Sequence, residues 1–181
     1  MKFLALAALA AGCGSNGYVH VTMTDDPAAG TVTQLMITVD EVRIHDDGDP
    51  SYAAGGDSGA QADGATGKGW VVLCNNEQTF DLLQLTGGKS LPLCGGQQAE
   101  VATGRVSQIR LGVKSAQVVV DGVAQDLAVP SGAQSGLKIA FDAELQKDQV
   151  LEVKLDFDAQ KSLVQQGNGS WSLKPVLRAL P

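Results

Sequence analysis

The segment from Val150 to Leu177 constrains the fold of this chain more than any other. Its first part, Val150–Asp158, reads VLEVKLDFD and alternates apolar with charged side chains. A period of two is typical of a β-strand with one buried and one exposed face. After a Gly-Asn-Gly loop, a returning strand carries Trp171 and Leu173 and is limited by Pro175. Such strands need neighbouring strands and a covering layer, so the segment predicts a β-rich fold.

Further strand patterns precede this segment. Apolar residues alternate over 18–24, 32–45, 70–73, 79–83, 109–113 and 137–141. The alternation changes phase at Asp40–Glu41, which predicts a β-bulge or a strand that changes sheets there. In the segment 117–129, Asp121-Gly122 predicts a hairpin, because these residues tolerate the positive φ angles of a type I′ turn.

Helical periodicity is confined to the short segments 142–149 and 159–165. Many short strands with frequent turns predict an all-β fold. We expect a single antiparallel β-sandwich of about nine strands, with an immunoglobulin-like or transthyretin-like architecture.

Composition limits the core and the partners. The chain has 181 residues, enough for one domain, and 44% are hydrophobic but only 4% aromatic, which predicts a core of Val, Leu, Ile and Ala. The formal net charge is −7. This balance argues against nucleic acid, which attracts clustered basic residues, and against electrostatic binding to anionic lipid.

The amino terminus resembles a bacterial lipoprotein signal. Residues 1–12 contain one basic residue and a short apolar run that ends in small residues before Cys13. Cleavage before Cys13 would leave this cysteine to carry lipid, residues 13–17 as a tether, and 18–181 as the domain. The alternative is an ordinary secretory signal followed by a chance cysteine. Gly14 is not the aspartate of inner-membrane retention, which favours the outer membrane.

Cys74 and Cys94 are the cysteines that remain when Cys13 is assigned to lipid. In an oxidising compartment we expect them to form a disulfide. A metal site is the rival interpretation, but the two cysteines lack CxxC spacing.

Acidic residues gather in two places. Residues 46–69 are rich in Gly, Ala and Asp without periodicity, which predicts a long disordered surface loop, and Asp46, Asp47 and Asp49 could hold calcium there. Solvated charge is the competing interpretation. Asp25 and Asp26 with Asp156 and Asp158 form a second acidic set, for which a turn cap and an exposed strand face are expected.

Few residues are candidates for ligand stacking or catalysis. Trp70 could stack on a ligand such as a sugar, whereas Trp171, within a strand pattern, is expected in the core. Residues 56–59, GDSG, resemble the surroundings of a protease nucleophile, but they lie in the acidic loop and the chain has only His20 and His45 as bases. We expect no catalytic residues, no enzyme activity and no metal site.

Several blocks are similar to one family. They are TDDP, TQLMITVDEVRIH, TFDLLQLTGG, GRVSQIRL, VVVDGVAQDLAVPSGAQSGLKIAF and LDFDAQKSLVQQGNGSWSLKPVLR, in that order. They resemble the bacterial domain of unknown function 4382, where the family usually has Ala at the place of Asp26. The resemblance implies a secreted or lipid-anchored β-sandwich and supplies no activity. The 46–69 loop and the Cys74/Cys94 pair look like local additions.

These features together predict a non-catalytic binding or structural module of the bacterial cell envelope. Its partners would be the membrane, through the lipid on Cys13, and an unidentified protein or glycan, but not nucleic acid. No cofactor is expected. The alternative is an adhesion module that binds calcium or carbohydrate.

Overall fold

The computed structural model describes residues 16–26, 32–47, 69–129, 136–167 and 169–180. Several expectations fall on other residues. The signal at 1–12, Cys13, Asp49 and the GDSG segment at 56–59 lie outside the described residues, as does most of the acidic loop.

The described chain is almost entirely extended. In order, the elements are β1 (Asn16–Asp26), β2 (Val32–Asp46), β3 (Gly69–Cys74), β4 (Gln78–Asp81), the 3₁₀ turn η1 (Leu82–Leu85), β5 (Leu91–Pro92), the 3₁₀ turn η2 (Cys94–Gly96), β6 (Ala99–Ala102), β7 (Gly104–Val120), β8 (Val123–Leu127), β9 (Leu137–Leu145), β10 (Val150–Asp158), α2 (Ala159–Ser162), β11 (Leu163–Gln165), β12 (Trp171–Leu173) and β13 (Leu177–Leu180). None of the helices in these segments is long and apolar enough to span a bilayer.

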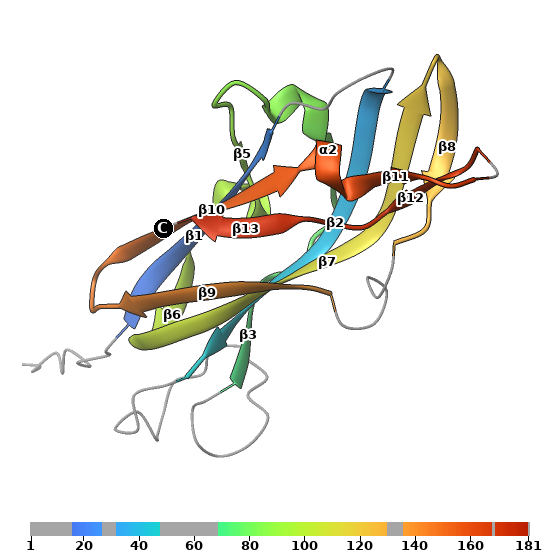
Figure 1. Ribbon diagram of the computed structural model, residues 1–181. Helices are drawn as coiled ribbons and strands as arrows, with labels where there is room; N and C mark the ends of the chain where they lie inside the picture. The colour runs from blue at the N-terminus through green and yellow to red at the C-terminus, as the bar shows by residue number, and fades with distance from the viewer. Residues whose placement is uncertain (1–15, 27–31, 48–68, 130–135, 168, 181) are drawn as a thin grey trace, which may run out of the picture.

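Two sheets form the two layers. Sheet A has the order β13-β10-β1, with β5 and β6 both paired to the other edge of β1. Sheet B is built on the long neighbours β2 and β7, which Figure 1 shows side by side. In sheet B, β3 and β4 line the free edge of β2, while β8 and β9 line that of β7. This two-layer arrangement confirms the expected sandwich.

The inner faces of both sheets share one core, which is mainly aliphatic as the composition predicts. Leu155 and Phe157 of β10 are 0% and 1% exposed, so the parity assigned to this strand from its sequence is confirmed. Its partner β1 contributes Val21 and Met23, and β2 contributes Ile37 from the opposite sheet. Burial of alternate side chains on both layers is what holds the sheets together.

The phase change at Asp40–Glu41 is a β-bulge, as predicted, and β2 remains in sheet B throughout. The β2–β7 register shifts between Val39 and Glu41. Gly112 lies opposite the bulge, where a Cβ atom would collide with the Asp40 carboxylate and come within 3.2 Å of the Glu41 backbone nitrogen. Any larger residue here would force the Asp40 carboxylate to move and would crowd the Glu41 backbone, so glycine favours the close approach of the two strands.

The predicted hairpin is also confirmed. Val120 pairs with Val123, and the turn residues Asp121 and Gly122 have φ angles of 49° and 79°. Both angles are positive, as a type I′ turn requires.

The structure differs from the sequence expectation in three details. β1 and β10 pair in parallel, with Val21 opposite Val153, so the sandwich is not purely antiparallel. The described residues form thirteen strands instead of about nine, because several strands of two to four residues escape a periodicity search. Of the two expected helical segments, 142–149 continues β9 into a turn, and 159–165 contains only the single helical turn α2.

Candidate functional site

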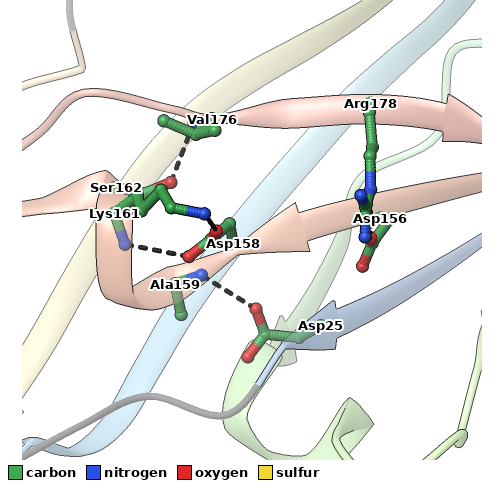
Figure 2. Close-up of polar contacts among 8 residues, drawn as sticks. All are labelled: Asp25, Asp156, Asp158, Ala159, Lys161, Ser162, Val176 and Arg178. Carbon is green, nitrogen blue, oxygen red and sulfur yellow. Dashed lines mark hydrogen bonds and ion pairs between the residues drawn. The ribbon is translucent and has the colours of Figure 1, made fainter.

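The second acidic set lies where β1 and β10 end side by side. The parallel register places Thr24 opposite Asp156 and Asp25 opposite Phe157. Figure 2 shows that Asp25, Asp156 and Asp158 point to different partners instead of toward one shared centre. We call this region the acidic junction, defined by these three aspartates.

Two aspartates of the acidic junction cap the turn α2. The Oδ1 atom of Asp25 accepts a hydrogen bond from the Ala159 backbone N–H at 3.0 Å, and Asp158 Oδ1 accepts one from the Lys161 backbone N–H at 2.9 Å (Figure 2). Lys161 Nζ also donates to Asp158 Oδ2 at 2.5 Å. The expectation that these acids act as turn caps is therefore confirmed.

The expectation of an exposed strand face is wrong for Asp156, which is only 7% exposed. β13 pairs with β10 at this point and places Arg178 opposite Asp156. The guanidinium donates to Asp156 Oδ2 from Nε at 2.6 Å, and Nη2 lies 2.5 Å from the same oxygen. The edge strand covers the carboxylate, which a pattern of alternation alone does not reveal. The acidic junction thus fastens β13 and α2 to β10.

We expect Asp158→Ala to lower the free energy of unfolding by about 1 kcal/mol at pH 7, because it removes a cap. The hydrogen bonds from the Lys161 ammonium and backbone N–H hold the pKa of Asp158 below its ordinary value. A lowered folded-state pKa gives a stabilisation that is fully present above the unfolded-state pKa of about 4 and is lost as the pH falls further, through the folded-state pKa. Urea unfolding should therefore show a smaller deficit at pH 3 than at pH 7, and an equal deficit would contradict this account.

The proposed calcium ligands do not assemble among the described residues. Asp46 is 2% exposed, whereas Asp47 is half-buried and its Oδ1 lies 2.9 Å from His45 Nδ1. Within the described segments, no group of three or more His, Cys, Asp or Glu side chains could hold a metal ion. The calcium interpretation also needs Asp49, which lies outside these segments, and it stays a prediction.

Trp70 lies on the outer face of sheet B. It is the register partner of His45, and the two rings meet edge-on with centroids 5.0 Å apart. The Arg110 guanidinium carbon lies 3.8 Å from the Trp70 ring centroid, in the position of a cation–π contact. Trp70 keeps part of its surface in solvent. The stacking role expected for Trp70 is therefore compatible with its position, although Arg110 already occupies one ring face.

Ser107, His45 and Asp47 form a constellation that the sequence did not suggest. The Ser107 hydroxyl lies 3.3 Å from His45 Nδ1, and the Asp47 carboxylate approaches the same nitrogen. In a Ser-His-Asp triad the hydroxyl and the carboxylate contact different ring nitrogens, so that the imidazole can pass a proton between them. Because both contacts here converge on Nδ1, the group is arranged as a polar network on the sheet and not as a relay.

The cysteine pair forms the expected disulfide. Cys74 ends β3 at the edge of sheet B, and Cys94 begins η2, with the Cα atoms 5.4 Å apart. The adjoining Leu93 backbone N–H donates to Val21 O of β1 at 2.9 Å. The bridge therefore links the edge of sheet B to a segment bound to sheet A. No CxxC-type metal site is needed to explain these cysteines.

Sequence reasoning missed Arg110, Lys138 and Ser107. Each lies in an ordinary alternating strand pattern, and only the structure shows its neighbours: Ser107 contacts His45, Arg110 packs on Trp70, and Lys138 lies opposite Arg110. The available signal was weak: Arg110 and Lys138 occupy outward positions of strands that were themselves predicted.

Comparison with known families gives one result. Residues 16–175 match the family described as a domain of unknown function, DUF4382, and this chain belongs to that family. The match confirms the resemblance noted from the sequence blocks. No curated protein matches the chain.

Proposed function

We propose that this DUF4382 protein is a lipid-anchored β-sandwich of the bacterial cell envelope that acts as a non-catalytic binding or structural module. In this proposal, cleavage before Cys13 leaves a lipid-modified cysteine and a short tether to β1. The outer membrane is the favoured location, because Gly14 stands where inner-membrane retention would use aspartate.

The observation that carries the proposal is the position of β1. This strand begins at Asn16, within the expected tether of residues 13–17, so that Asn16 and Gly17 already belong to the sheet. It is paired on both edges: to β10 along Tyr18–Asp26, to β6 along Asn16–Val19, and to β5 at Thr22 and Met23. Force applied at the amino terminus would therefore act on a central strand of sheet A and not on an edge strand, which is paired on one side only. This suits a domain held by its amino-terminal end. The disulfide also favours a compartment outside the cytoplasm.

Subcellular fractionation of Cys13→Ser tests the anchoring. We expect the wild-type chain in the membrane fraction and the Cys13→Ser chain in the soluble fraction, because the apolar run within residues 1–12 is too short to span a bilayer by itself. Ser15→Cys in the Cys13→Ser background is the matched control, since it restores a thiol two residues away. Continued membrane association of Cys13→Ser after carbonate washing would contradict lipidation at this residue.

A second candidate function is carbohydrate binding, the alternative expected from the sequence. The specific observation in its favour is the placement of Trp70 on an outward sheet face beside basic side chains. An aromatic ring with an adjacent polar group is a frequent recognition element. Binding of a soluble glycan would support this candidate. The outcome of the Cys13→Ser fractionation does not depend on whether a glycan binds.

A further inference from the structure

A row of basic side chains crosses the outer face of sheet B. Arg43 of β2 is the register partner of Arg110 of β7, which is in turn the partner of Lys138 of β9. Opposing residues in neighbouring strands point to the same face. The residues that follow them in the strands are buried in the core: Ile44, Leu111 and Ile139. We call Arg43, Arg110 and Lys138 the cation row.

The cation row differs from the rest of sheet B in how its charge is balanced. Elsewhere in the sheet, basic side chains have acidic partners: Arg105 pairs with Asp142, and Lys114 pairs with Glu77. Within the row, Arg43 pairs with Glu41. Among the described residues, Arg110 and Lys138 have no acidic partner. Positive charge therefore remains at the centre of the face, in a chain whose formal net charge is −7.

Arg110 has a hydrogen-bond donor that no described residue uses. It packs on Trp70, and its Nε atom is buried without an acceptor among the described residues. Like charges directly opposite one another on neighbouring strands destabilise a sheet. An anion bound between Arg110 and Lys138 would relieve that repulsion and offer acceptors to the guanidinium.

We propose that the cation row, together with Trp70, binds the carboxylate of an acidic sugar, a uronic-acid residue of a polysaccharide. The planar guanidinium of Arg110 matches a carboxylate in shape and charge. The partly exposed indole of Trp70 offers apolar surface to the adjoining sugar ring. Two basic groups without acidic partners suit one carboxylate per ring, whereas a nucleic-acid backbone would require many more. This inference rests on the proposal that the domain is a binding module, and it names the ligand class.

Isothermal titration of the full chain in non-ionic detergent, with galacturonic-acid oligomers as the probe, tests the inference. We expect the wild-type chain to bind, and Arg110→Gln to weaken binding by about tenfold, as the loss of a charge-assisted hydrogen bond implies. Lys138→Gln should weaken binding in the same direction. Arg105→Gln is the matched control, because it removes the same charge from an exposed, acid-paired side chain of the same strand, and it should change affinity by less than about twofold.

Each remaining outcome decides the question. Binding of the fully methyl-esterified oligomer with equal affinity would show that the carboxylate is not recognised, and equal binding of poly-glutamate would show an acidic-peptide ligand; either overturns the inference. So would the absence of galacturonate binding, or equal weakening by Arg105→Gln and Arg110→Gln. The melting temperature of Arg110→Gln should not fall, and if that variant fails to fold, the exposed Lys138→Gln decides alone. Absence of galacturonate binding would not change the expected result of the Cys13→Ser fractionation, so failure of this inference can be distinguished from failure of the anchoring proposal.

Discussion

Replacing Phe157 by alanine should lower the free energy of unfolding by about 4 kcal/mol, because it removes an aromatic ring from a closed core. Phe157 is 1% exposed and belongs to the core shared by both sheets. In a chain of this length, such a loss corresponds to a fall in melting temperature of roughly 8–16 °C. Thermal unfolding followed by circular dichroism measures it.

Val123→Ala is the matched control for this substitution. Val123 begins β8 and is 61% exposed, so its truncation should change stability by no more than about 0.5 kcal/mol. A Phe157→Ala variant as stable as Val123→Ala would mean that β10 does not turn this face toward the other sheet.

Removing the disulfide should cost about 3 kcal/mol. Cys74 and Cys94 are 20 residues apart, a loop length at which a cross-link restricts the unfolded chain by about this amount. The measurement is the melting temperature of the wild-type chain with and without reductant, beside that of the double variant Cys74→Ser/Cys94→Ser. We expect reductant to lower the wild-type value to that of the double variant.

The double variant is its own control, because reductant should leave its melting temperature unchanged. Two titratable thiols in the unfolded, unreduced wild-type chain would contradict the bridge. A wild-type melting temperature insensitive to a reductant that opens the bridge would contradict its stabilising role.

Local signals were sufficient for much of the fold. The Asp121-Gly122 turn is determined by the φ preferences of two residues, and the burial of β10 by its own alternation. The bulge at Asp40 is visible because a single extra residue reverses the phase of the pattern. In each case the information lies within a few consecutive residues.

The pairing partners were not predictable in this way. Val21 of β1 pairs with Val153 of β10, and a period-two pattern carries no information on whether such distant strands run parallel or antiparallel. Asp156 was misjudged for the same reason: its cover, Arg178, arrives on another strand. The cation row likewise depends on the register of three strands, so neither Arg110 nor Lys138 could be singled out beforehand.

The most direct test of the proposal that lipid on Cys13 anchors the β-sandwich is mass spectrometry of the amino-terminal peptide. The chain would be purified from the membranes of its own cells. We expect the chain to begin at Cys13 and this cysteine to carry lipid. An amino-terminal peptide in which Cys13 is unmodified, or one that still contains residues 1–12, would contradict it.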